Sequence, residues 1–253
     1  MLRAWPLCLI AALVGCSGQY YLTAPDQLAP AGGSATAVVR IQRHEFMGIA
    51  LAVKNAPLRL WVTDQPLRAA FADKKGYAGA VVPVPDKEGL YSLTVATQDI
   101  RGDEFSKDFP TYVWPASQPI VVVDLECVPL GPKAPAAVGE ALNRLAKNAN
   151  IVYFTSRDVN DYPRVHEQLQ GNHLPDGPVL PWRKSDWINT ALVSQLPQMR
   201  QQFSAVNIGI CSSAAAAGAF SAAGMDCVVV GNEKVTAARA VYRSWADLAA
   251  KGL

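Results

Sequence analysis

The fold of the second half of the chain is decided by residues 120–126, which read IVVVDLE. Four consecutive apolar residues followed at once by acids are typical of a strand that is buried on both faces. Such strands belong to parallel sheets, whose ligand site lies beyond the carboxyl ends of the strands. Asp124 is therefore placed where a functional side chain is expected.

Further strands and helices alternate after this stretch. The apolar patterns predict strands over residues 151–155, 206–210 and 227–230, and helices over residues 134–147, 162–170, 186–202 and 212–223. Strands that alternate with helices form parallel sheets covered by helices on both faces. The sequence thus predicts an α/β, doubly wound domain over residues 118–253.

The segment before it has a different pattern. Short runs rich in β-branched and aromatic residues, separated by turn formers, cover residues 37–43, 48–53, 58–63, 77–84, 90–97 and 110–114. This spacing is typical of an all-β sandwich, which we expect over residues 35–115. No nucleophile, base or metal ligand clusters there, so the sandwich is interpreted as a scaffold or an interaction module.

The first residues have the features of a lipoprotein signal peptide. Arg3 precedes an apolar stretch, residues 4–14, that contains no acid and is too short to span a bilayer. It ends in Leu-Val-Gly-Cys at residues 13–16, the order of a lipobox. We expect a signal peptide over residues 1–15 and a lipidated Cys16, with an ordinary secretory signal as the alternative.

The residues after Cys16 bear on where the protein resides. Ser17 stands where an Asp would have resembled an inner-membrane retention signal, which favours the outer membrane, facing the periplasm. Residues 16–34 are rich in Pro, Gly, Ala and Gln without a clear period, so they are predicted to be a flexible tether.

Charge and the remaining chemistry-bearing residues exclude some classes of function. The net charge is +2 and the basic residues are scattered, so no nucleic-acid partner is expected. With Cys8 in the signal and Cys16 lipidated, three cysteines remain, which allow at most one disulfide. The histidines lack metal-ligand spacing and are interpreted as surface or structural residues: His44, His166 and His173.

Three motifs in the second half occur in a recognisable order. Asp124 and Glu126 follow the first strand, Thr155-Ser156-Arg157 closes the second, and Lys184 precedes a predicted helix. In this the chain resembles the haloacid dehalogenase superfamily, whose first motif is D-x-D-x-T. Residues 174–180, LPDGPVL, are similar to the F-P-x-G-P segment of the lipin-type and actin-patch-type phosphatidate phosphatase domains.

The resemblance implies a mechanism for an intact member. Asp124 would attack phosphorus, and Glu126 would act as general acid and base. Thr155 would bind the phosphoryl oxygens, and Lys184 would offset their charge. Mg²⁺ would be held by Asp124, by the backbone carbonyl of Glu126 and by an acid of the fourth motif.

The fourth motif departs from the family pattern. Residues 209–214 read GICSSA, with Ile210 and Ala214 in the two acidic places. Asp158 and Glu233 are the acids that could replace them. Glu126 is also one methylene too long, and a misplacement of about 1 Å can cost about a hundredfold in rate.

We therefore expect a membrane-tethered, phosphatase-like module that is non-catalytic or weakly active and binds a phosphorylated or lipidic ligand or an envelope protein. The alternative is an active phosphatidate or phosphomonoester phosphatase that requires Mg²⁺ and uses Asp124; a purely structural envelope protein is a third possibility.

The resemblance also bears on the cysteines. Superfamily members place the first-motif and fourth-motif strands side by side, which implies that Cys127 and Cys211 lie close together and could form a disulfide. Cys227, on the neighbouring strand, competes for Cys211.

Overall fold

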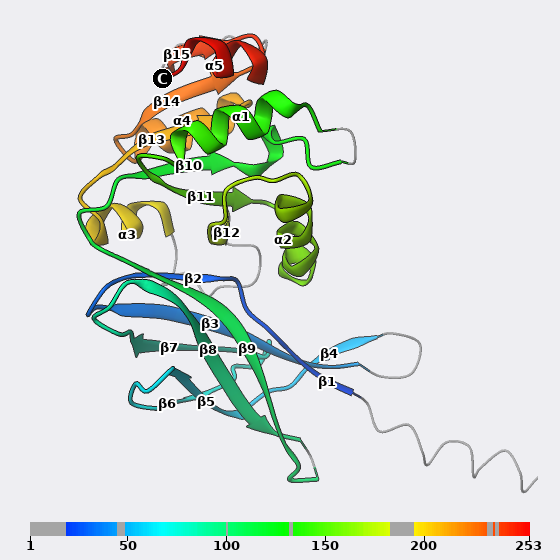
Figure 1. Ribbon diagram of the computed structural model, residues 1–253. Helices are drawn as coiled ribbons and strands as arrows, with labels where there is room; N and C mark the ends of the chain where they lie inside the picture. Colours follow the sequence, from blue (N-terminus) through cyan, green and yellow to red (C-terminus); the bar gives the residue numbers. More distant parts are fainter. Residues whose placement is uncertain are drawn as a thin grey trace, which may run out of the picture.

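The computed structural model describes residues 19–44, 49–99, 101–131, 134–182, 195–231, 235 and 238–253. Figure 1 shows a β-sandwich built from the first half of the chain and a parallel sheet with helices built from the second half. Both predicted architectures are confirmed. Within the described part of the chain, no helix is long and apolar enough to cross a membrane.

The sandwich consists of two sheets that enclose one core. In the first sheet, the long strand β3 (Ser34–His44) pairs antiparallel with β1 (Gln19–Thr23), β4 (Ala50–Ala52) and β7 (Tyr77–Pro83). The second sheet has the order β2 (Gln27–Pro30), β9 (Glu104–Trp114), β8 (Gly89–Gln98), β5 (Pro57–Val62) and β6 (Arg68–Phe71).

Alternation along the strands explains the core. In β5, Leu58, Leu60 and Val62 are buried, whereas Arg59 between them is exposed, as the two-residue period of a strand requires. At the turn before β7, the Asp73 side chain accepts hydrogen bonds from the backbone N–H groups of Lys75 and Tyr77. Such a side-chain turn reverses the chain between β6 and β7.

The predicted tether is wrong for residues 19–34. Gln19–Thr23 forms β1 against β3, and Gln27–Pro30 forms β2, which pairs in parallel with β9. Leu22, Asp26 and Ala29 are buried. The Pro-rich and Ala-rich composition hid two short strands that tertiary pairing stabilises, so the sandwich begins at Gln19 and not at residue 35.

The second half forms a parallel sheet of six strands. Their order is β12 (Val179–Pro181), β11 (Asn150–Thr155), β10 (Ile120–Asp124), β13 (Val206–Cys211), β14 (Asp226–Val230) and β15 (Ala238–Tyr242). One face packs on α1 (Ala136–Leu145), α2 (Tyr162–Gly171) and α5 (Trp245–Lys251). The other face packs on α3 (Gln195–Gln202) and α4 (Ala214–Ala222).

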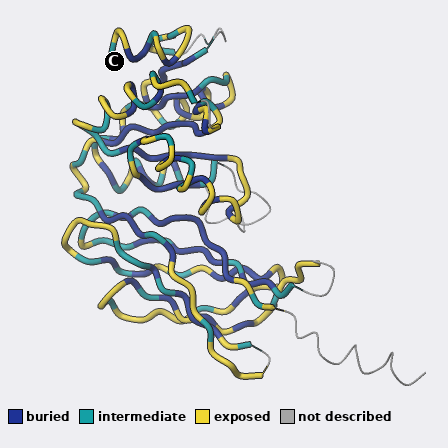
Figure 2. Tube along the Cα trace, turned by 45° about the vertical axis from the view of Figure 1, so that its right-hand side comes forward, coloured by how far each residue is buried: buried dark blue, intermediate teal, exposed yellow. Residues whose placement is uncertain are grey.

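Strand β10 lies in the middle of this sheet and is buried at every residue (Figure 2). Val121 and Val123 belong to the core under α1, α2 and α5, whereas Ile120 and Val122 belong to the core under α3 and α4. The chain order reverses between β10 and β13, and doubly wound sheets bind ligands at such a switch point. Asp124, the last residue of β10, lies there.

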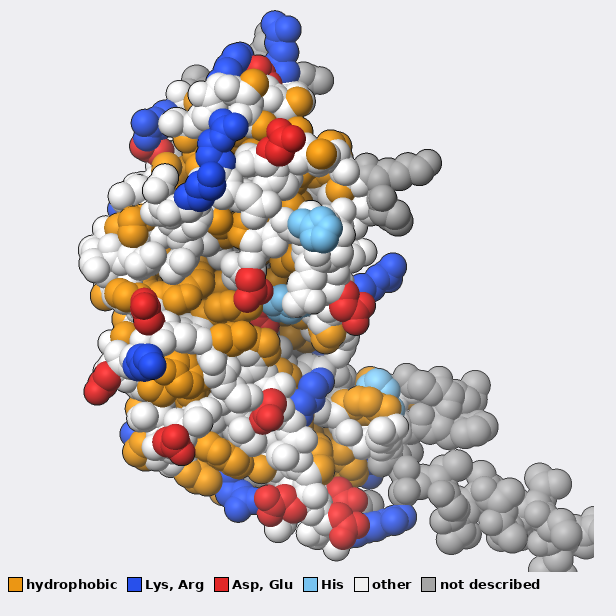
Figure 3. Space-filling view, viewed as in Figure 1, with side chains coloured by type: hydrophobic (Ala, Val, Ile, Leu, Met, Phe, Trp, Pro, Cys, Tyr) orange, Lys and Arg blue, Asp and Glu red, His pale blue; other side chains and the backbone are white. Residues whose placement is uncertain are grey.

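Charged side chains are dispersed over the face of the molecule that Figure 3 draws. On the face drawn in Figure 3, basic and acidic side chains alternate over both halves, with no large field of one sign. This distribution agrees with the near-neutral net charge of +2.

Candidate functional site

Asp124 is held in place at the carboxyl end of β10. Asp124 is only 4% exposed, and its Oδ1 accepts a hydrogen bond of 2.7 Å from the indole Nε1 of Trp182. The backbone N–H of Glu126 approaches the same oxygen at 3.4 Å, at the start of the short helical turn η2 (Leu125–Cys127). The Trp182 ring lies 5.1 Å from the rings of both Phe154 and Phe220, which fix its orientation.

The Glu126 carboxyl contacts the end of the next strand, β11. Its Oε1 accepts hydrogen bonds from Thr155 Oγ1 at 3.0 Å and from the Ser156 backbone N–H at 2.7 Å. Thr155 Oγ1 in turn accepts from the Arg157 backbone N–H at 3.1 Å. Thr155, the residue that the sequence resemblance assigns to the phosphoryl oxygens, is therefore engaged by Glu126, as is the neighbouring Ser156 N–H.

The electrostatics favour a protonated Asp124. Burial and, after it, the side-chain hydrogen bond with Glu126 raise the pKa of Asp124 to about 7, although the hydrogen bond from the Trp182 indole lowers this pKa. A carboxyl that still holds its proton near neutral pH is a weak nucleophile, since attack requires the ionised form.

Asp158, one of the two acids that the sequence offers as replacement metal ligands, is engaged by its own turn. Asp158 is exposed, and its Oδ1 accepts from the backbone and side-chain nitrogens of Asn160 at the start of the turn η3 (Val159–Asp161). Ile210 is fully buried in the core, and Ala214 is the exposed first residue of α4. Lys184, Glu233 and the lipidation residue Cys16 lie outside the described residues.

Mg²⁺ does not fit the part of the site that the structure describes. No group of three or more His, Cys, Asp or Glu side chains that could hold a metal occurs among the described residues. One carboxyl oxygen of each side chain, Asp124 Oδ1 and Glu126 Oε1, already accepts hydrogen bonds from protein donors. Mg²⁺ is usually bound by one or two carboxylates and several waters, and at this pair it would have to compete with the donors that hold Asp124 Oδ1 and Glu126 Oε1.

The implied disulfide between Cys127 and Cys211 is not formed. Both are free thiols, as is Cys227, and Cys211 Sγ lies 3.5 Å from Cys227 Sγ. Cys211 belongs to the core under α3 and α4, whereas Cys127 packs on the core under α1, α2 and α5. Successive residues of β13 point to opposite faces, so Cys211 is directed away from Cys127.

Trp182 is a site residue whose role the sequence reasoning missed. It follows β12 directly and its ring reaches across β11 to Asp124, which lies 58 residues earlier in the chain. A weak signal exists, since an aromatic residue that follows a strand of a parallel sheet lies at the carboxyl edge where sites are found. Nothing in the spacing identifies its partner.

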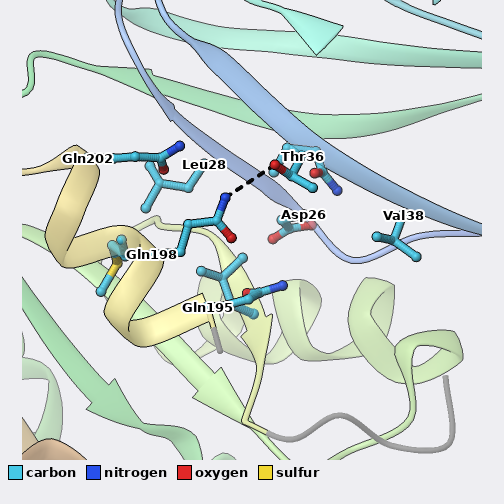
Figure 4. A pocket seen from close by; sticks show the side chains of 10 residues that line it. Asp26, Leu28, Thr36, Val38, Gln195, Gln198 and Gln202 are labelled. Atoms are coloured by element: carbon cyan, nitrogen blue, oxygen red, sulfur yellow. Dashed lines mark hydrogen bonds between the residues drawn. The ribbon is translucent and has the colours of Figure 1, made fainter. Parts of the chain in front are cut away.

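A small pocket of about 50 Å³ lies between the two halves of the molecule (Figure 4). Amide side chains of Gln195, Gln198 and Gln202 from α3 face Thr36 and Leu28 of the sandwich, and Gln198 Nε2 donates to Thr36 Oγ1 at 3.2 Å. Neither Asp124 nor Glu126 lines this pocket, which belongs to the junction of the halves and not to the carboxyl pair.

Comparison with known proteins does not place the chain in a family. No family model matches it, and no curated protein does. Solved structures similar to parts of it include the CARDB domain of a Pyrococcus furiosus protein, with 12% identity over 39% of this chain and 88% of that one, at a TM-score of 0.25. A 2,6-sialyltransferase of Photobacterium sp. JT-ISH-224 has 10% identity over 81% of this chain, at a TM-score of 0.24.

The chain spans 41% of that sialyltransferase. The periplasmic chaperone SfaE has 10% identity over 41% of this chain and 66% of its own, at a TM-score of 0.23. Likenesses of this size carry no argument about fold or function.

Proposed function

We propose that the chain is an envelope protein anchored by a lipid on Cys16, and that its second half is a haloacid dehalogenase-like domain that binds a ligand without turning it over. The order of its parallel strands, with Asp124 and Thr155 at the ends of β10 and β11, supports the resemblance. The lipobox at residues 13–16 supports the anchor at Cys16, with the outer membrane, facing the periplasm, as the location.

One observation carries the non-catalytic function: Glu126 acts as an internal ligand. Its Oε1 accepts from both Thr155 Oγ1 and Ser156 N, the pair of donors that would otherwise hold a phosphoryl oxygen. Phosphoryl transfer depends almost entirely on positioning and on offsetting charge. A carboxylate on these donors repels the phosphoryl group that the site would have to position.

The ligand class follows from the same donors. A hydroxyl and a backbone N–H at the end of a strand suit an oxyanion, which would displace the Glu126 carboxyl. A phosphorylated or phospholipid headgroup matches this chemistry and is available to a protein tethered to a membrane. Lys184 is the expected cation of such a site.

Phosphate binding and hydrolysis test this proposal together. Glu126→Ala frees both donors. We therefore expect the variant to bind inorganic phosphate at least about tenfold more tightly than the parent chain does, because a charge-assisted hydrogen bond contributes about 1.5–3 kcal/mol. Glu140→Ala, which removes an exposed carboxylate from α1, is the matched control and should leave phosphate binding unchanged.

Hydrolysis of phosphatidate and of an aryl phosphate, with and without Mg²⁺, is measured on the same proteins, and we expect no turnover above background. Magnesium-dependent turnover by the parent chain that Asp124→Asn abolishes would establish the active phosphatase instead. Unchanged phosphate affinity in a folded Glu126→Ala variant would remove the internal-ligand argument.

A further inference from the structure

One end of the sandwich exposes apolar side chains beside the start of the described chain. Gln19 of β1 lies opposite His44 of β3, which lies opposite Ala50 of β4, so the three strands reach this end together. Near it, Ile49 is 57% exposed, Leu51 is 44% exposed and Tyr21 is 37% exposed. In Figure 3, hydrophobic side chains and a histidine meet at the right-hand edge of the sandwich, over β1 and β4.

Strand β4 lacks the polar side chains that are typical of a strand exposed to water. All of its residues are exposed, and residues 49–52 read IALA, with no polar or charged side chain. Edge strands of soluble proteins are usually protected by charges, prolines or bulges. An apolar edge strand that is exposed on both faces therefore indicates a surface that something covers.

The length of chain before β1 indicates what covers it, and this step rests on the proposed lipidation of Cys16. Ser17 and Gly18 alone separate Cys16 from Gln19. Three residue steps span at most about 11 Å when fully extended. Neighbouring strands lie about 4.8 Å apart, so β4 is about 10 Å across the sheet from β1. An acylated Cys16 at the bilayer surface would hold all three strand ends within reach of the lipid headgroups.

We propose that this end of the sandwich, formed by Tyr21, His44, Ile49, Ala50 and Leu51 and here named the docking tip, inserts into the headgroup region of the bilayer that holds the lipid anchor. Ile49 and Leu51 supply apolar surface, and Tyr21 supplies an aromatic ring with a polar end, which packs at a tilt against the His44 ring with centroids 4.2 Å apart. Tyr side chains of this kind favour the membrane interface. The tip and the anchor together fix the orientation of the molecule on the membrane.

The charged groups near the docking tip are of both signs, since Arg43 of β3 lies opposite Leu51 and acids lie in the turn described next, so apolar contact and not attraction to anionic lipid should drive the docking. The turn between β8 and β9 carries Asp99, Arg101 and Asp103, and Glu104 is paired with Arg59 at 2.5 Å. This turn lies at the same end of the sandwich, since Phe105 packs on Tyr20 with ring centroids 5.8 Å apart. Docking should therefore occur on uncharged phosphatidylcholine and should persist at high salt.

Nitroxide spin labels measure how deeply the docking tip lies in the bilayer. The full lipidated chain, carrying Ile49→Cys or Leu51→Cys with a nitroxide label, is reconstituted in phosphatidylcholine vesicles. Leu90→Cys is the matched control, because Leu90 is 60% exposed but lies at the opposite end of the sandwich, across from Tyr112, whose hydroxyl contacts Asp176 of the second half. The labelled parent chain gives the background from the native thiols.

We expect the labels at positions 49 and 51 to lose collisions with a water-soluble nickel complex and to gain collisions with oxygen, while the label at position 90 remains as accessible to nickel as in water. The mass of the purified chain reports acylation of Cys16 separately. An acylated chain whose labels at 49 and 51 behave like the label at 90 would overturn the docking tip and leave the anchor intact.

An unacylated Cys16 would overturn the anchor and the docking argument with it. Strong spin–spin broadening between labels at position 49 in detergent would assign the tip to a second copy of the chain and would also overturn the membrane proposal.

Discussion

Glu126 is one methylene longer than the aspartate of the family motif, and this length decides which groups its carboxyl reaches. From the turn η2 it extends to the end of β11, where it accepts from Thr155 Oγ1 and Ser156 N at 3.0 and 2.7 Å. An aspartate at the same position would end about one carbon–carbon bond short of these donors and would leave them open. The extra methylene thus accounts for the closed state of the site.

The protonation of Asp124 predicts a pH dependence of stability. The pKa of Asp124 is raised from 3.8 to about 7 in the folded protein, mainly by burial. The folded state therefore binds more protons than the unfolded state between about pH 4 and pH 7, and the free energy of unfolding should fall as pH rises through this window. Asp124→Asn mimics the protonated carboxyl and keeps an acceptor for Trp182 Nε1, so it should lack this part of the decline.

Denaturant unfolding of the parent and of Asp124→Asn at several pH values measures the difference. The advantage of the parent over the variant should shrink from pH 4 to pH 7. A difference that stays constant across this range would show that Asp124 is ionised in the folded protein throughout.

At the scale of elements, Gly177 explains why the segment 174–180 carries a glycine between its prolines. A Cβ built on Gly177 would lie 2.0 Å from the backbone oxygen of Ile151, at the edge of β11. The carbonyl oxygen of the next residue, Pro178, accepts a hydrogen bond of 2.9 Å from the Tyr153 N–H. This bond begins the pairing of β12 with β11. The segment must therefore approach the strand closely before β12 can form.

Gly177→Ala should destabilise the protein by about 1–3 kcal/mol, because backbone atoms of β11 or β12 must move to admit the methyl group. Gly171→Ala is the control: Gly171 ends α2 with no atom near the place of a Cβ, so this substitution should be neutral or slightly stabilising. Thermal unfolding of both variants checks the prediction. Equal melting temperatures would mean that the segment adapts without cost.

The sequence predicts a helix or strand where one hydrophobic pattern extends over enough residues. It does not predict the short strands that form only because they pair with a neighbouring strand. The buried run of β10 and the amphipathic α1 are found where expected. Strands β6 and β12, with four and three residues, are too short to show a period, and β15 and α5 carry no motif. At the site, the order of motifs anticipates that the ends of β10 and β11 meet, whereas the Trp182 contact depends on ring packing that spacing does not encode.

At the scale of the whole molecule, a buried carboxyl joins the two halves. Asp26, in the segment between β1 and β2, is 4% exposed, and its Oδ2 accepts from the Val179 backbone N–H at 2.6 Å and contacts His166 Nε2 at 2.8 Å. Tyr112 Oη donates to Asp176 Oδ1 at 3.1 Å nearby. Leu28 and Trp114 of the sandwich pack on the core under α3 and α4. The three hydrogen bonds link residues up to 153 positions apart, which no local pattern reveals.

The same junction should make stability fall with rising pH. Burial raises the pKa of Asp26 above 3.8, and the Asp26 carboxyl raises the pKa of His166 above 6.5 against the effect of burial. Both shifts mean that the folded protein holds more protons than the unfolded chain, so the free energy of unfolding decreases as pH rises above each ordinary value. Above pH 6.5 His166 contributes to the decline, because Asp26 and Asp176 no longer face a charged imidazole once it loses its proton.

His166→Gln keeps a hydrogen-bond donor for Asp26 but cannot titrate, so its unfolding free energy should vary less than that of the parent above pH 6.5. Asp26→Ala should cost about 1–3 kcal/mol from the hydrogen bond alone, because the Val179 N–H is left buried without its acceptor. Urea unfolding of the three proteins between pH 5 and pH 9 separates the two effects. Parallel pH curves for the parent and His166→Gln would show that the imidazole contributes no proton linkage, and the junction would then depend on the Asp26–Val179 hydrogen bond and on apolar packing alone.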